Sequence, residues 1–205
     1  PLTRIRSELE TSAAHPTTVD IASTQASVLE EAKAMEVLVA DLLFLARGDA
    51  GQMRSRFAPV DVDDLVLAEA ERIRTDSQIL VDVSAVSAGQ VDGDRGQLRR
   101  LIGNLADNAA RYATSTIRFS LAEQDDHVLL AVSDDGPGIA PDDRERVFDR
   151  FARTDEGRSR DEGGSGLGLA IARDVAVRHG GSVFIDGGHR GGTRMLVRLP
   201  RRRPG

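Results

Sequence analysis

Apolar side chains recur at a seven-residue spacing in residues 21–45. The stripe consists of Ile21, Val28, Met35 and Leu42, with Leu38 and Leu45 at the matching second position. This spacing predicts a helix with a coiled-coil-like seam, although Thr24 and Glu31 weaken its early part.

A shorter apolar stripe (Leu2, Ile5 and Leu9) predicts a helix before this one. The segment AAHPTT separates the two, because Pro16 restricts His15 to non-helical angles. Residues 1–47 are therefore predicted to form a helical hairpin, which can bury little apolar surface alone. We expect it to pair with a second copy as a four-helix bundle. The alternative is that the stripe packs on the rest of the same chain.

The pattern changes to mixed helix and strand after a predicted linker and first strand at residues 48–60. Helical spacing marks residues 61–74, 94–113 and 166–180, and a short helix is expected to start in 140–151. Alternating or apolar runs predict strands in residues 79–85, 115–124, 127–134, 181–188 and 192–200. The strands at 115–124 and 127–134 are expected to pair, and those at 181–188 and 192–200 are expected to form a hairpin. Gly180 is expected to end the last helix. The sequence thus predicts an α+β protein.

Composition narrows the function classes. The 205 residues carry a net charge of -6, which does not favour binding to nucleic acid or to an anionic membrane. There is no cysteine, so disulfides, thiolate metal sites and cysteine nucleophiles are excluded. The terminal arginines 201–203 are expected to be solvated. No apolar run reaches the roughly 20 residues of a membrane helix. Because the chain begins with Pro1, we expect it to be a piece of a longer protein.

Two asparagines stand one turn apart in the segment GNLADNAARYA. Asn104 and Asn108 are predicted to share one helical face, followed by Arg111 and Tyr112. Asparagine is a mediocre helix former, because its amide competes with the backbone for hydrogen bonds. The pair is either polar helix surface or a binding site.

Glycine-containing segments follow the asparagine helix. SDDGPGI places Asp134 at a strand end before Gly136 and Gly138, which alone is an ordinary turn. GGSGLGLAIA opens into a helix, whose N-terminus attracts phosphate. It matches neither the P-loop nor the G-x-G-x-x-G pattern, and a flexible linker is its alternative. HRGGTR carries Gly191, Gly192 and Thr193 in a predicted hairpin turn.

The segment RVFDRFAR lies between these glycine segments. It places Phe148 and Phe151 three residues apart, beside Arg150 and Arg153. At least one of the two rings should be buried. The alternative to a functional role is the end of an amphipathic helix with a solvated basic face.

The order of these segments resembles the catalytic, ATP-binding part of the sensor histidine kinases. In that family they are the N, G1, F, G2 and G3 boxes, and here the resemblance covers residues 54–199. It implies a Bergerat-fold α/β sandwich. Residues 1–47 resemble the dimerisation and histidine-phosphotransfer hairpin of the same family, and residues 200–205 remain as a basic tail.

The resemblance implies a site for ATP and Mg²⁺. Asn108 would coordinate the metal and Asn104 would support the same face. Asp134 would accept a hydrogen bond from the adenine amino group. Arg111, Arg150 and Arg153 would act on the phosphates, with residues 153–164 as a lid. The implied cofactor-binding set is Asn108, Tyr112, Asp134, Gly136, Gly138, Ile139, Gly164, Gly166, Leu167, Gly168 and Thr193.

The resemblance also implies the acceptor of the phosphoryl group. PLTRIRSELE resembles the continuation of the H-box, in which the acceptor histidine stands five residues before a proline that matches Pro1. His15 lies in the interhelical turn and does not replace it. We therefore expect ATP binding without autophosphorylation.

Three expectations on partners and location follow from this family. They are a response-regulator receiver domain as the partner, a homodimer weakened by the short first helix, and a position in the cytoplasmic part of a membrane-bound bacterial parent. No nucleic acid or membrane contact is expected.

Related ATPases of the gyrase, heat-shock-90 and mismatch-repair group carry a glutamate where Asn104 stands, and it acts as general base on water. An amide cannot take that proton at neutral pH, which argues against strong ATP hydrolysis. Two other interpretations remain: an ATP-binding regulatory or phosphatase-type module, and an anti-sigma-factor-like serine kinase. The helical hairpin disfavours the last.

Overall fold

The computed structural model describes residues 3, 6, 10, 21–50, 56–152, 165–189 and 191–202. The chain consists of two compact units, Pro1–Gly51 and Gln52–Gly205. In the first, α2 (Ile21–Asp49) is a continuous helix over the predicted stripe. Leu29, Val37, Val39, Leu42 and Leu43 of this helix are exposed. Residues 3, 6 and 10 are helical. The remainder of the first predicted helix and the predicted turn that contains His15 lie outside the described residues.

The second unit contains a five-stranded sheet in the order β2-β4-β5-β7-β6. Its strands are β2 (Leu80–Val86), β4 (Thr116–Glu123), β5 (His127–Asp134), β6 (Ser182–Ile185) and β7 (Arg194–Pro200). β2 and β4 are parallel, and all other neighbours are antiparallel. The predicted pairing of residues 115–124 with 127–134 and the final hairpin are therefore confirmed.

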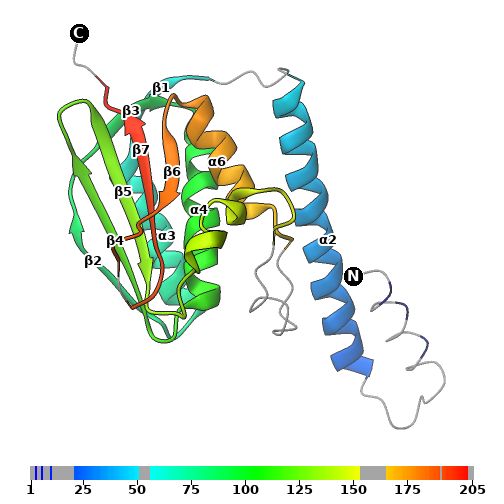
Figure 1. Ribbon diagram of the computed structural model, residues 1–205. Coiled ribbons are helices and arrows are strands. Elements are labelled where there is room, and N and C mark those ends of the chain that lie inside the picture. The colour runs from blue at the N-terminus through cyan, green and yellow to red at the C-terminus, as the bar shows by residue number, and fades with distance from the viewer. Residues whose placement is uncertain are drawn as a thin grey trace. The chain divides into compact units, whose positions relative to one another are not determined.

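Three helices lie together against one face of this sheet (Figure 1): α3 (Val62–Asp76), α4 (Arg95–Tyr112) and α6 (Gly168–Arg178). Alternate residues of β4 (Ile117, Phe119 and Leu121) are buried, as are residues of α4 at helical spacing, such as Leu101 and Leu105. The predicted α+β class and the two-layer sandwich are confirmed.

A small antiparallel pair, β1 (Ala58–Asp61) with β3 (Gln90–Gly93), lies outside the main sheet. The hydrophobic pattern did not predict β3. Asp92 and Gly93 are both unfavourable in strands, and the segment QVDG is too short to show alternation. β3 exists because the backbone of β1 pairs with it, which is a tertiary cause.

The predicted short helix in residues 140–151 was wrong in kind. The segment forms two separate 3₁₀ turns, η1 (Pro141–Asp143) and η2 (Arg146–Phe148). Only Phe148 of these two turns is buried. A short helix needs an apolar face that packs, and this charged segment lacks one.

Arg201 and Arg202 are not simply solvated, which corrects a second expectation for these two residues, and Arg203 lies outside the described residues. The Arg201 guanidinium lies 2.7 Å from a carboxylate oxygen of Glu123. The backbone N–H of Arg202 donates to the Gln90 carbonyl at 3.1 Å, and its guanidinium donates to the Gln90 side chain. These two residues therefore attach the chain beyond β7 to the end of β4 and to β3. Their sequence offered no apolar signal for this contact.

The ends of α4 and α6 are fixed by local hydrogen bonds. Asp94 caps α4, because its Oδ1 accepts the N–H groups of Gly96 and Gln97. α6 ends in a Schellman motif, in which Gly180 has φ +72° and the N–H of Gly181 donates to the Ala176 carbonyl. The prediction that Gly180 ends this helix is confirmed. No described helix has both the length and the apolar character needed to cross a membrane.

Candidate functional site

A buried carboxylate stands at the end of β5. Asp134 is 3% exposed, and its Oδ1 accepts the N–H groups of Gly136 at 2.9 Å and Thr193 at 3.3 Å. Its Oδ2 is buried and has no hydrogen-bond partner. Burial raises the pKa of this carboxyl, although the two backbone donors oppose the rise. A buried acceptor without a donor is costly, so the arrangement fits a ligand that brings an N–H group to Oδ2.

Three glycines allow the backbone segments around Asp134 to touch. A Cβ on Gly136 would collide with the carbonyl oxygen of Tyr112, and one on Gly192, where φ is +120°, would collide with the Asp134 carbonyl. Gly138, at φ +83°, faces the Gly192 carbonyl, 3.1 Å from the place of a Cβ. The end of α4, the end of β5 and the turn before β7 thus meet at backbone contact. Gly192 was not among the predicted site residues, although the pair before Thr193 was visible in the sequence.

Asp135 has the opposite environment to its neighbour. Its carboxylate accepts the backbone N–H groups of Thr114, Ser115 and Thr116 and the Ser115 hydroxyl. These bonds, the Ser115 hydroxyl first, hold its pKa well below the usual range. Asp135 therefore fixes the loop between α4 and β4. Sequence reasoning missed this role, because SDDG does not say which aspartate faces the helix.

The two asparagines lie on the same side of α4, as predicted. Asn104 faces α6: its Oδ1 lies 3.3 Å from the place of a Cβ on Gly168, and its Nδ2 is buried without a partner. Asn108 faces β7, where its Nδ2 donates to the Met195 sulfur at 3.9 Å. That contact directs the amide nitrogen to the sheet. Amide oxygens are acceptable Mg²⁺ ligands, so the donor set fits a magnesium ion bound chiefly by substrate phosphates.

The glycine loop is the segment GGSGLG that ends at Gly168, of which residues 165–168 are described, and it leads directly into α6. Gly166 has φ +68°, Leu167 is fully buried, and Leu167 as N-cap residue offers no side-chain acceptor to the first turn. Unbonded N–H groups at a helix start attract anions. The arrangement therefore suits phosphate binding.

The prediction that at least one of Phe148 and Phe151 is buried is confirmed. Phe148 is 5% exposed and Phe151 is 59% exposed. Phe151 adopts φ +63°, which is unusual for a bulky residue, and its N–H donates to the Gly166 carbonyl at 2.9 Å. The segment after η2 is therefore fastened to the glycine loop.

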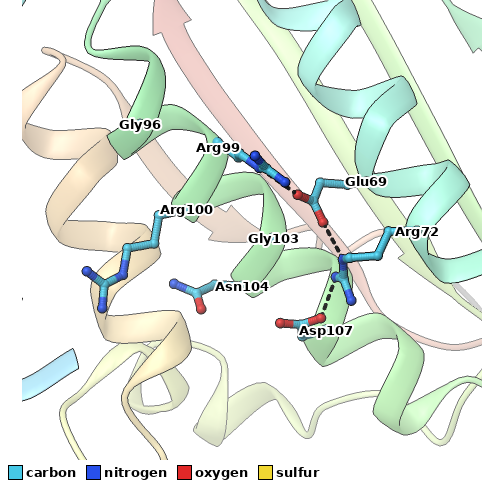
Figure 2. A pocket seen from close by; sticks show the side chains of 8 residues that line it. All are labelled: Glu69, Arg72, Gly96, Arg99, Arg100, Gly103, Asn104 and Asp107. Carbon is cyan, nitrogen blue, oxygen red and sulfur yellow. Dashed lines mark hydrogen bonds and ion pairs between the residues drawn. The ribbon is translucent and has the colours of Figure 1, made fainter. Parts of the chain in front are cut away.

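A hollow of about 360 Å³ lies between α3 and α4 (Figure 2). Across it Glu69 joins Arg72 and Arg99, and Arg72 reaches Asp107 at 2.5 Å. Of the predicted site residues only Asn104 lines it. Figure 2 shows Asn104 apart from this ion network. The hollow therefore adjoins the site at Asn104, and neither Asp134 nor the described part of the glycine loop lines it.

The remaining predicted site residues lie on exposed turns, make a single backbone contact, or fall outside the described residues. Arg111 is exposed in the last turn of α4, and Ile139 accepts a bond from Arg144 through its carbonyl. Arg150 is exposed beyond η2. Arg153 and Gly164, with the predicted lid between them, lie outside the described residues.

Comparisons with known proteins agree with this geometry. Residues 93–203 match the family described as histidine kinase-, DNA gyrase B- and HSP90-like ATPase. The signal transduction histidine-protein kinase/phosphatase MprB of Mycobacterium tuberculosis is 40% identical over 192 residues, which are 90% of this chain and 37% of that protein. The chain thus corresponds to little more than a third of that relative's length.

Two solved structures carry the same fold. A mycobacterial sensor histidine kinase MprB structure aligns with 72% of this chain and 100% of its own, with a TM-score of 0.65 and 36% identity. Full-length ShkA in complex with AMPPNP aligns with 99% of this chain and 44% of its own, with a TM-score of 0.73 and 28% identity. Since the family match covers more than half of the residues and the boxes stand in order, the chain belongs to the histidine kinase-, DNA gyrase B- and HSP90-like ATPases, and within them to the sensor histidine kinases.

Proposed function

We propose that this chain binds Mg²⁺-ATP and transfers the γ-phosphoryl group to a histidine that lies outside its 205 residues, for onward transfer to an aspartate of a response-regulator receiver domain. The buried, unpartnered Oδ2 of Asp134 is the observation that carries the proposal. An adenine amino group would donate to this oxygen, whereas guanine presents a carbonyl there and would be repelled. ATP would thus be selected over GTP.

The phosphate end of the proposed site has a different chemistry. Asn108 would supply a neutral oxygen ligand to the metal, and Gly166 and Gly168 would allow the start of α6 to approach the phosphates. Bound Mg²⁺ would neutralise charge on the phosphate oxygens. Arg111, Arg150 and Arg153 would stabilise further negative charge.

Asn104 distinguishes transfer from hydrolysis. Its amide cannot accept a proton from water at neutral pH, so the chain lacks a general base at the position where the related ATPases carry glutamate. We therefore propose phosphoryl transfer to a protein side chain with weak ATP hydrolysis. Dimerisation through the helices of residues 1–47 is part of the same proposal, and the exposed apolar residues of α2 support it.

A second candidate is a phosphatase-type role. The relative MprB is described as both a kinase and a phosphatase, and the same nucleotide site can serve a module that only regulates dephosphorylation. The two activities differ in whether label from ATP ever reaches a histidine.

Labelling with γ-³²P ATP and Mg²⁺ separates the candidates. The chain is incubated alone, and then with a separately made dimerisation domain that carries an H-box histidine. We expect acid-labile label on the added domain only, and none with Asn108→Ala.

Label on the chain alone would overturn the placement of the acceptor. ATP binding without label on either protein would favour the regulatory module. Failure to bind ATP in the presence of Mg²⁺ would overturn both candidates.

A further inference from the structure

A buried imidazole joins the two helices that form the walls of the proposed nucleotide site. His179 ends α6 and is 7% exposed. Its Nδ1 lies 2.8 Å from the Val175 carbonyl, and its Nε2 lies 3.1 Å from the backbone nitrogen of Asp94. A carbonyl can only accept and a backbone N–H can only donate, so the proton is on Nδ1 and Nε2 is an acceptor. The ring is therefore neutral in this arrangement.

Asp94 extends the connection in two directions. Its Oδ1 caps the first turn of α4, and its Oδ2 accepts the backbone N–H of Arg56 at 3.1 Å. The next residue, Phe57, places its ring 5.0 Å from the His179 ring. A Cβ on Gly93 would lie 2.7 Å from His179 Cδ2, so the imidazole fills its space. The start of α4, the end of α6 and the segment before β1 thus meet at one side chain, and we name this junction the His179 clasp.

α4 begins at the clasp and runs toward Asn104, whereas α6 begins near Asn104, at Gly168, and runs toward the clasp. Asn104 lies ten residues after Asp94, and Gly168 lies eleven residues before His179. At 1.5 Å per residue these separations are about 15 Å along α4 and about 16 Å along α6, and this similarity explains why Asn104 and Gly168 meet at the other end. Within the packing of α4 against α6, the clasp therefore lies at one end and the approach of Asn104 to Gly168 lies at the other.

We infer that His179 is a positioning residue for the nucleotide site, and this inference rests on the proposed ATP-binding function. The neutral ring fixes α6 along α4 and so sets the spacing between Asn104 and the glycine loop. Through Phe57 and Arg56 the same ring connects this spacing to the segment before β1. A displacement of that segment would reach the phosphate end through the clasp.

Two substitutions at His179 separate its hydrogen bond from its volume. His179→Met fills the space with no strong acceptor for the Asp94 N–H, whereas His179→Gln places an amide oxygen near the position of Nε2. Well below the melting temperature, His179→Met is expected to weaken ATP binding about tenfold, a common size for coupling through a packed network. His179→Gln should restore most of the loss, and Phe57→Ala should give a smaller loss.

Ser77→Ala is the matched stability control. The Ser77 hydroxyl donates to the Ile73 carbonyl at the end of α3 at 2.8 Å, remote in sequence from α4 and α6. This variant should lower the melting temperature and leave ATP affinity unchanged. An equal loss of affinity in Ser77→Ala, or wild-type affinity in a folded His179→Met, would overturn the positioning role.

The ring nitrogens give a test that needs neither ATP nor a variant. ¹⁵N NMR of the wild-type chain at neutral pH should show His179 protonated on Nδ1 only. A proton on Nε2 would overturn the clasp. A wild-type chain that shows the expected tautomer and binds no ATP would overturn the proposed function while leaving the hydrogen-bonded junction in place.

Discussion

The two ends of the proposed nucleotide site are built in different ways. At the Asp134 end, three backbone segments touch, and glycine is required because a Cβ at Gly136 or Gly192 would collide with a carbonyl. At the Asn108 end, the site consists of side chains and a helix start, with a buried Asn104 Nδ2 that has no partner. The first end lacks only a donor for the buried Asp134 Oδ2, whereas the second end lacks an acceptor for the buried Asn104 Nδ2.

This difference separates selectivity from chemistry. A rigid, buried acceptor can distinguish one base from another before any phosphate is bound, because the protein has already been ordered around it. In the proposed function, phosphoryl transfer depends on charge and position, which the asparagines and the glycine loop would provide together with the bound metal and phosphates. Substitutions at one end should therefore leave the function of the other end measurable.

Asn108→Ala should have the largest effect. Loss of this proposed metal ligand is expected to reduce phosphoryl transfer about a thousandfold, since metal stabilisation of the transition state is worth several kcal/mol. The free energy of unfolding should change little, because the amide makes only a weak bond to the Met195 sulfur. The measurement is the labelling rate, with adenosine binding as the control. Equal losses of both would contradict the separation of the two ends.

Gly192→Ala should damage the Asp134 end through the fold itself. The added Cβ meets the Asp134 carbonyl at a φ of +120°, and we expect a loss of about 3 kcal/mol in the free energy of unfolding. Gly191→Ala is the matched control, since Gly191 has φ +83° with no atom within 4 Å of its Cβ position. That variant should lose about 1 kcal/mol, the cost of left-handed backbone strain alone. Urea denaturation of the two variants measures the difference, and equal losses would rule out the collision.

Asp134→Asn should separate stability from affinity. The amide can still accept the bonds of Gly136 and Thr193, but it presents a donor in place of Oδ2. Loss of a hydrogen bond to a charged group is worth about 1.5–3 kcal/mol, so ATP affinity should fall roughly ten- to a hundredfold. The melting temperature should be unchanged or higher, because a desolvated charge has been removed. Calorimetry of both quantities tests this, and a fall in stability with retained affinity would be the contrary result.

The pH dependence should be the smallest effect. Burial raises the pKa of Asp134 in the folded state, so the folded chain holds this proton more tightly than the unfolded chain does. The destabilising contribution of Asp134 is absent below the unfolded pKa and is fully present above the raised folded pKa. Adenosine affinity should change in the other direction and fall as the pH drops through the raised pKa.

Adenosine, which has no titrating phosphate, is the suitable probe for this pH series. We expect its affinity to fall as the pH is lowered from 7 through the raised pKa of Asp134 in the wild type, a change that Asp134→Asn should abolish. A fall of the same size in Asp134→Asn would assign the titration to another group.

Much of the secondary structure was predictable because its signals are local. The seven-residue stripe gave α2, the alternating runs gave β4 and β5, and Gly180 marked the end of α6. Three features were predicted wrongly or not at all. Two of these features depend on partners that are distant in sequence: β3 pairs with β1, and Arg202 binds Gln90. The third is the segment of η1 and η2, which has too few buried apolar residues to form a longer helix.

The sequence by itself determined the order of the five boxes, the α+β class and the amide at position 104 where related ATPases carry a base. These are properties of residue type and spacing, which no fold is needed to read. Only the tertiary structure decided that Asp134 keeps one buried oxygen without a partner while Asp135 is fully hydrogen-bonded, and that Gly192 must lack a Cβ. It also placed His179 against Asp94, 85 residues apart. Such contacts arise when the helices pack on the sheet, so the chemistry of adjacent and identical residues diverges only after folding.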